Sequence, residues 1–491
     1  MTTPDQPGQW PQQPDQWPQQ PGQWPQQPQG GYPPGATPAG GYPQDPAQQY
    51  PQATPPGGYP QYQQQPGYQN HPGYYGQQPG YPPPAPPRRG KRGLIIGLVI
   101  ALVVLAGGGV GTYFALSGND SGADTPTAAA MKLATSISNS DIVGVAESLA
   151  PAESAVFTDP ISDATNELKR LKVLDSSADP KALSGIQVKT ENLTFDEAGA
   201  EQVNDHVTIT KLTAGTITIT SDFTKLPLAK EFLDEAMPGG ARPSRSTDTE
   251  TINIADEVRK NGEPIRIATV KVDGAWYPSL LYTIADYALK DAHQKWPSTS
   301  IPANGAASPN EAVKQTLQAA LDSDVRRVIE LLPPDEMGAL HDAGPAIVNA
   351  IGDAKPSGAK VLDLQTQTSP VTGGTRATLT SVKIEANGEQ YTVTKNGDCY
   401  EATGEGRTQR MCADDIAGQL EGEIGTSLPS SVTDVLRHLS SGLLGQGIGI
   451  VTTEVSGKYY VSPLRTVVEG GMTVLRSLQP GDITALVKAA N

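Results

Sequence analysis

Two parts of the chain repeat each other at one fixed offset, and this repeat restricts the possible folds more than any other feature. The stretch 126–153 aligns with 309–336, and the stretch 273–283 aligns with 456–466 at the same offset. Two separated matches at one offset indicate a tandem duplication. The predicted copies are 126–296 and 309–491, and 297–308 is the linker between them.

Each copy begins with helical patterns and continues with long strand-like runs. Asp324 is typical of an N-cap, which predicts a helix over 325–332. The Asn-Gly pairs at 387–388 and 396–397 favour hairpin turns. The predicted strands are 207–219, 265–272, 377–384, 391–394 and 448–455. Helices followed by a meander of strands in each copy predict an α+β fold class.

The N-terminal segment 1–87 has a different composition from the rest of the chain. It contains no Lys or Arg, three acidic residues, and no Leu, Ile, Phe or Val. Such a segment cannot bury enough apolar surface to offset its ordering entropy, so we predict a disordered Pro/Gln/Gly/Tyr-rich tail. Its repeated aromatic residues are compatible with a docking arm and equally with a passive spacer.

The run 94–116, which contains no charged residue, follows the tail. As a helix it is about 35 Å long, which exceeds a hydrocarbon core of about 30 Å. We therefore predict one transmembrane helix and a plasma-membrane location. The basic segment 88–93 precedes it and the linker 117–125 follows it, so the positive-inside rule predicts a cytoplasmic N-terminus and an extracytoplasmic C-terminal part. The residues that set this topology are Arg88, Arg89, Lys91 and Arg92.

The charge of the chain is divided unequally between its parts. The net charge is −16, and the segment up to Arg92 contributes about +1, which leaves about −17 for the remainder. An acidic folded part argues against nucleic acid as its partner.

The strand Gly457-Lys-Tyr-Tyr-Val-Ser462 near the end of the second copy, after helices and a strand meander, resembles the NTF2-like (cystatin-like) cone-shaped α+β fold. The resemblance implies two tandem NTF2-like cone domains. The layout also resembles actinobacterial single-pass envelope proteins that join a Pro/Gln/Tyr-rich tail to such an ectodomain. Members of the wider fold include enzymes, ligand binders and assembly modules, so the fold alone implies no activity.

The only two cysteines, Cys399 and Cys412, lie in one hairpin-like stretch. In an oxidising compartment this pair most simply forms a disulfide. Zinc is the alternative, but no histidine lies in the stretch, and a redox Cys-x-x-Cys spacing is absent. A loop of this size stabilises a fold by roughly 3 kcal/mol on the loop-entropy model.

Aromatic residues occur at matching positions of the two copies, near the end of each strand meander. Alternation along a strand directs one residue of each pair into the cone and the other outward. These residues are candidates to line a ligand cavity, and plugging the core is the alternative. The candidates are Trp276, Tyr277, Tyr459 and Tyr460.

No motif for catalysis, metal binding or a cofactor is found. None of the five histidines lies in a metal-ligand pair or near a nucleophile elbow. An isomerase of the NTF2-like fold needs a buried carboxylate with a tyrosine or acid partner. Asp286, Tyr282 and Tyr287 supply these residue types, but their ordinary amphipathic pattern favours a solvated helix face.

These observations favour a non-enzymatic, membrane-anchored cell-envelope protein. We expect its duplicated extracytoplasmic domain to bind a protein partner or an apolar, lipid-like ligand, while the tail contacts a cytoplasmic partner. One alternative is a transmembrane sensor that signals to the tail. The other is an isomerase- or hydrolase-like enzyme with an open pocket and a buried carboxylate.

Overall fold

The computed structural model describes residues 122–138, 146–179, 186–222, 226–236, 248–352, 354–424 and 429–490. All of them belong to one compact unit, Pro83–Asn491. Residues 1–121 lie outside the described residues, and with them the predicted tail and the basic segment 88–93.

The described ranges contain no helix that is both long and apolar enough to cross a membrane. A span needs about 20 consecutive apolar residues, whereas α13 (Ser430–Gln446) has 17 residues and is amphipathic. The predicted fold class is corrected on this point to α+β without a membrane helix in the described part. The predicted span 94–116 lies outside the described residues. The single-pass, plasma-membrane assignment that depended on it is withdrawn.

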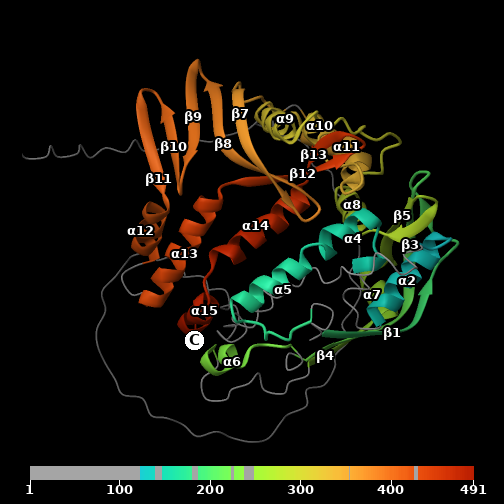
Figure 1. The fold of residues 1–491 in the computed structure, drawn as a ribbon. Helices are drawn as coiled ribbons and strands as arrows, with labels where there is room; N and C mark the ends of the chain where they lie inside the picture. Colours follow the sequence, from blue (N-terminus) through green and yellow to red (C-terminus); the bar gives the residue numbers. More distant parts are fainter. Residues whose placement is uncertain are drawn as a thin grey trace, which may run out of the picture. The chain divides into compact units, whose positions relative to one another are not determined.

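The first repeat combines helices with an antiparallel sheet (Figure 1). The strand order is β1-β3-β5-β6, and β2 and β4 both pair with β3. Its elements are α2 (Pro126–Ser138), α4 (Pro151–Thr158), α5 (Ile161–Arg170), β1 (Ile186–Phe195), β2 (Glu201–Gln202), β3 (Val207–Ser221), α6 (Lys230–Ala236), β4 (Asp248–Asn253), α7 (Ile254–Asn261), β5 (Ile265–Val272), β6 (Ala275–Pro278) and α8 (Leu280–Asp291).

The second repeat has the same core layout and an additional hairpin. The strand order is β11-β10-β9-β8-β12-β13, and β7 pairs with β8. Its elements are α9 (Pro309–Leu321), α10 (Val325–Glu330), α11 (Gly338–Ile351), β7 (Lys360–Val371), β8 (Gly374–Ala386), β9 (Glu389–Asn396), β10 (Cys399–Gly404), β11 (Arg407–Cys412), α12 (Ala413–Ile424), α13, β12 (Gly449–Val455), β13 (Lys458–Val461), α14 (Pro463–Ser477) and α15 (Asp482–Ala490).

Local sequence signals account for several of these boundaries. The pair Asn387-Gly388 forms the turn between β8 and β9 with both residues at positive φ, as an Asn-Gly hairpin requires. The Asp324 side chain accepts a hydrogen bond from the Arg327 amide at 2.9 Å and caps α10, as predicted. The helix ends at Glu330, earlier than the predicted end at Leu332.

The two repeats make the same backbone contacts at aligned positions. Ala123 forms an isolated antiparallel bridge with Trp276, and Ala306 forms the corresponding bridge with Tyr459. In both repeats the segment before the first helix therefore pairs with the last strand, which leads into α8 or α14. The offset found in the sequence is thus an offset between equivalent places in the fold.

The strands β3 and β8 are equivalent as well, but at a smaller offset. Ala268 of β5 pairs with Ile209, while Val451 of β12, which aligns with Ala268 in the repeat, pairs with Arg376. Ile209 and Arg376 therefore occupy equivalent places. The offset is smaller here because the connection from α5 to β3 is longer than the equivalent connection from α11 to β8. It rises again toward β12 because the β10–β11 hairpin and α12 follow β9 only in the second repeat.

Candidate functional site

The two repeats contact each other through equivalent residues. The Tyr282 hydroxyl on α8 donates a hydrogen bond to Asp342 Oδ2 of the second repeat at 2.9 Å. Arg465 occupies the position of Tyr282 on α14, and its Nη1 lies 2.9 Å from Oδ2 of Asp159, which occupies the position of Asp342. Such reciprocal contacts are the pattern of an interface with two-fold symmetry. Accordingly, α8 packs against α11, and α14 packs against α5.

Asp342 is the centre of a polar cluster between the repeats. Its Oδ2 accepts hydrogen bonds from Asn204 Nδ2 at 3.0 Å and from Tyr282, and it lies 2.9 Å from His206 Nε2. Its Oδ1 accepts from Ser300 Oγ at 2.5 Å. Burial opposes ionisation of Asp342, but the bonds from His206, Ser300 and Tyr282 outweigh it and lower its pKa.

His206 is the cation of this cluster. The hydrogen bond to Asp342, with a smaller contribution from the contact with Asp205, raises the pKa of His206 to about 9, although burial opposes the shift. The imidazole Nδ1 lies 2.8 Å from Asp205 Oδ1. At neutral pH His206 is therefore protonated, and both ring nitrogens donate to carboxylates.

The second repeat makes the equivalent contact with a different cation. Gly373 immediately precedes β8, as His206 immediately precedes β3. A Cβ atom on Gly373 would collide with the Arg465 guanidinium, and its φ of 75° also favours glycine. In the contact with Asp342 the positive charge thus comes from His206, just before strand β3. In the contact with Asp159 it comes from Arg465 on helix α14.

In each repeat a buried glutamate accepts a hydrogen bond from the N-cap serine of the helix that follows the last strand. Ser279 and Ser462 are the N-caps of α8 and α14, and each donates its hydroxyl to a glutamate in the first helical part of its own repeat. Glu153 also accepts from the Leu280 amide at 2.8 Å. The second repeat has a proline at that position, and Arg465 Nε donates to Glu336 Oε1 at 2.5 Å instead.

Glu153 consequently differs from Glu336 in its charge environment. Burial raises the pKa of Glu153, and the hydrogen bonds from Ser279 and the backbone only partly offset this effect. Both glutamates line a cleft of about 500 Å³ between the repeats, together with His206, Tyr282 and Asp342. All of these acidic side chains make hydrogen bonds within the protein, so they serve first to join elements.

The residue types that suggested an enzyme have structural partners. Asp286 is buried, and its two carboxylate oxygens accept from Arg266 at 2.5 and 3.1 Å. Trp296 Nε1 donates to Asp286 at 3.0 Å, and the Tyr287 hydroxyl accepts from the Arg266 amide at 3.0 Å. The predicted solvated helix face is therefore wrong for Asp286 and for the buried Tyr282. Within the described ranges, no cluster of three or more His, Cys, Asp or Glu residues is arranged to hold a metal ion.

The aromatic cavity candidates lie at the bridges between the first and last segments of each repeat. Tyr277 packs on Gly122 and Tyr460 packs on Gly305, since a Cβ atom on either glycine would lie 2.6–2.7 Å from ring atoms. Trp276 and Tyr459 form the bridges described above, and Lys271 Nζ lies 5.9 Å from the Trp276 ring centre. Among the described cavities, none is lined by these four aromatic residues.

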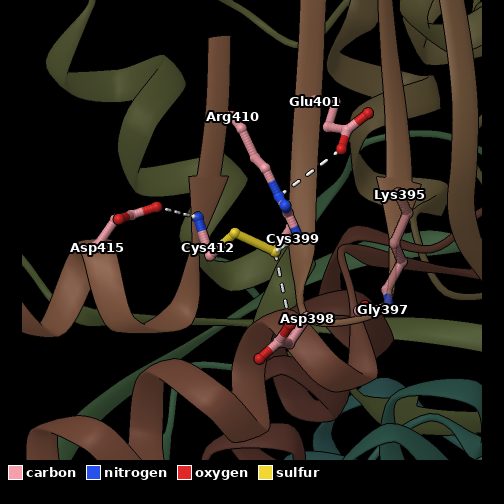
Figure 2. The surroundings of a disulfide bond; sticks show 8 residues. All are labelled: Lys395, Gly397, Asp398, Cys399, Glu401, Arg410, Cys412 and Asp415. Carbon is pink, nitrogen blue, oxygen red and sulfur yellow. Dashed lines mark hydrogen bonds and ion pairs between the residues drawn. A yellow bond between two sulfur atoms is a disulfide. The ribbon is translucent and has the colours of Figure 1, made fainter.

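The predicted disulfide between Cys399 and Cys412 is present (Figure 2). The two cysteines are directly paired across β10 and β11, and the bond closes the hairpin at its open end. Arg410 Nη2 lies 3.1 Å from Cys399 Sγ, and Asp415 accepts from the Cys412 amide at 2.9 Å. The bond thus anchors the additional hairpin of the second repeat to the start of α12.

An apolar groove of about 280 Å³ lies between α8 and α11, where the two repeats meet. Small side chains recur at helical spacing along both walls. The alanines of the α8 wall are Ala285, Ala288 and Ala292, and those of the α11 wall are Ala339, Ala343, Ala346 and Ala350. Ile284 at the rim is 56% exposed. Gln294 is the single polar residue among the lining residues described.

The equivalent place between α14 and α5 is closed. Only about 30 Å³ remains there. Val468, Met472 and Val156 occupy the positions of Ala285, Leu289 and Ala339. The β7–β8 turn also enters this place, where the Thr372 hydroxyl donates to Asp163 at 3.0 Å. The open groove is therefore specific to one side of the pseudo-symmetric pair.

Sequence reasoning did not predict the groove or the Asp342 cluster. The signal that could have found the cluster was the repeat itself, because Asp159 and Asp342 align at the same offset as the two repeated stretches. Alanines at helical spacing in 285–292 and 339–350 were a second signal, but they are also typical of ordinary buried helix faces.

Neither a protein-family model nor a curated protein matches the chain. Among solved structures, an "Ntf2 like protein involved in plasmid conjugation" is similar at 11% identity and a TM-score of 0.11. The alignment covers 52% of this chain and 91% of that chain. This neighbour has an NTF2-like description, but a likeness at this level carries no argument for fold or function.

Proposed function

We propose that the two repeats form a tandem NTF2-like, non-enzymatic binding module that takes an apolar group into the groove between α8 and α11. The observation that carries the proposal is the difference between the two equivalent places. One is narrowed by Val156 and Val468, while the other has Ala339 and Ala285 at these two positions and remains open. A fold that needed this place filled for stability would fill it on both sides.

The energetics of the groove favour occupancy. Apolar surface gains about 25 cal/mol for each Å² that is removed from water. The groove presents almost only apolar atoms, and its lining includes Leu281, Ile284 and Leu340. Its volume is close to the lower end of ligand sites, about 300 Å³. An apolar group therefore enters without leaving a buried polar atom unpaired.

The cleft between the repeats indirectly supports a binding function over an enzymatic one. Its buried carboxylates, Glu153 and Glu336, are bonded to the N-cap serines, and Asp342 is bonded to four donors. A general acid or base needs a position from which it reaches substrate. These groups instead hold helices, so no specific observation favours the enzyme alternative.

The proposal is tested with the full-length chain and the dye 8-anilinonaphthalene-1-sulfonate, whose fluorescence rises in apolar sites. Ala288→Trp places a large ring in the groove at an exposed position and is expected to lower the dye's affinity at least about tenfold. Val467→Trp is the matched control. Val467 occupies the position of Ile284 in the second repeat and is 71% exposed, away from the groove.

The control is expected to leave dye affinity unchanged, and circular dichroism checks that both variants keep wild-type helix content. Equal effects of the two substitutions, or no saturable binding to the wild type, would show that the groove is not a binding site.

A further inference from the structure

The closed counterpart of the groove is covered by helices of the same chain. An apolar cluster joins the ends of α5 and α14 to α13, α15 and α6. α13 packs along α14 and against α15, and α15 packs against α6. The covering side chains are Val435, Leu439, Ile483, Val487 and Phe232. As a result, Leu168 of α5 is only 1% exposed.

The open groove lacks this cover in the described structure. Ile351 of α11 occupies the position of Leu168, and it is 50% exposed. Ala292 occupies the position of the buried Leu475 and is exposed. In the first repeat, α7 precedes β5 as α13 precedes β12, but α7 packs on β3 and β4. The ends of α8 and α11 thus retain an apolar surface that the equivalent helices bury.

We infer that an amphipathic helix of a partner protein covers the α8–α11 groove, in the way that α13 and α15 cover α5 and α14. This inference rests on the proposed binding function and names the class of partner. A helix satisfies its own backbone hydrogen bonds, so it can lie on a surface with a single polar lining residue. An extended peptide would leave amide groups unpaired there.

The breadth of the exposed surface favours a helix over a hydrocarbon chain. A hydrocarbon chain would occupy the hollow that Ala288 and Ala343 line, whereas the exposed Ile351 of α11 is not among the residues that line it. A helix the length of α13, 17 residues, extends about 25 Å and presents apolar residues along one side. In α13 the buried members of that side include Val432 and Val435.

The test compares three probes for displacement of the same dye from the full-length chain. The first is a peptide of about 18 residues, made of Leu, Ala, Lys and Glu, with leucines at i, i+3, i+4 and i+7. The second has the same composition with leucines at alternate positions, and the third is laurate. The helical peptide is expected to displace the dye at a concentration at least about tenfold lower than either other probe, with a gain of helix in circular dichroism.

The groove variant assigns the effect to this surface. Ala288→Trp is expected to weaken the helical peptide at least about tenfold, while Val467→Trp does not. Displacement by laurate or by the alternating peptide at equal or lower concentration would overturn the inference of a helical partner. The proposed binding of an apolar group in the groove would still stand. Failure of all three probes against a dye that still binds also overturns it. If the dye itself does not bind, the proposed function has failed.

Discussion

Arg266 and Arg376 supply equivalent buried positive charges in the two repeats, but they do so from strands that are not equivalent. Arg266 on β5 pairs with Asp286, and Arg376 on β8 lies 3.5 Å from Glu469, which occupies the position of Asp286. The place of Arg266 in the second repeat is Gly449, and a Cβ atom there would collide with Arg376. The arginine has changed strand while its acidic partner has kept its place.

This exchange predicts a compensating pair of substitutions. Gly449→Arg alone is expected to destabilise the protein by about 1–3 kcal/mol, because two guanidinium groups then compete for the space beside Glu469. Adding Arg376→Ile, which reproduces the residue at Ile209, is expected to recover at least about 1 kcal/mol in a double-mutant cycle of urea unfolding. Additive effects of the two substitutions would show that the repeats are not equivalent here.

The Asp342 cluster predicts a large difference between two aspartates that contact the same histidine. Asp342→Ala leaves His206, Tyr282 and Ser300 without their acceptor and is expected to cost about 2–4 kcal/mol of unfolding free energy. Asp205 has a side chain that is 95% exposed, so Asp205→Ala is expected to leave the unfolding free energy nearly unchanged. Similar losses of unfolding free energy in the two variants would show that Asp342 is not the centre of a stabilising cluster. The measurement is equilibrium urea unfolding.

His206 predicts a loss of stability at alkaline pH. Its pKa is raised from 6.5 to about 9 in the folded protein, chiefly by the bond to Asp342. The stabilisation is therefore fully present below the unfolded pKa and is lost as the pH rises through about 9. The melting temperature is expected to fall between pH 7 and 10 in the wild type and to fall less in His206→Gln. A parallel decline in both proteins would contradict the assignment.

The disulfide predicts a local effect confined to the second repeat. Cys399→Ser with Cys412→Ser removes a cross-link with a sequence separation of 13 and is expected to lower the free energy of local opening of the β10–β11 hairpin by about 3 kcal/mol. Amide hydrogen exchange is expected to accelerate in β10 and β11, which the bond joins, and to remain unchanged in β3 and β5. Uniform acceleration across both sheets would show that the bond stabilises the protein globally.

Local and repeated signals in the sequence predicted much of the fold. The Asn387-Gly388 turn, the cap at Asp324 and the pairing of the two cysteines each depend on residues close together in the chain. The duplication was visible because equivalent residues keep one offset at both ends of each repeat. These features need no knowledge of how distant segments pack.

The site depends on contacts between distant segments, which the sequence pattern does not contain. His206 and Asp342 lie in different repeats, and Asp286 is buried because Arg266 on a neighbouring strand meets it. An amphipathic pattern assigns a charged residue to solvent, so it misplaced Asp286. The groove is hollow because two alanine-rich walls face each other across the repeats, and neither wall alone indicates a cavity.

The reciprocal contacts of Tyr282 with Asp342 and of Arg465 with Asp159 have a consequence for how such a protein diverges. In a dimer of identical chains, every substitution appears on both sides of the axis, so a change that opens one groove opens the other. With both halves encoded in one polypeptide, selection acts on each half separately. The place between α5 and α14 can then be filled and covered for stability, while the equivalent place between α8 and α11 can stay open for binding.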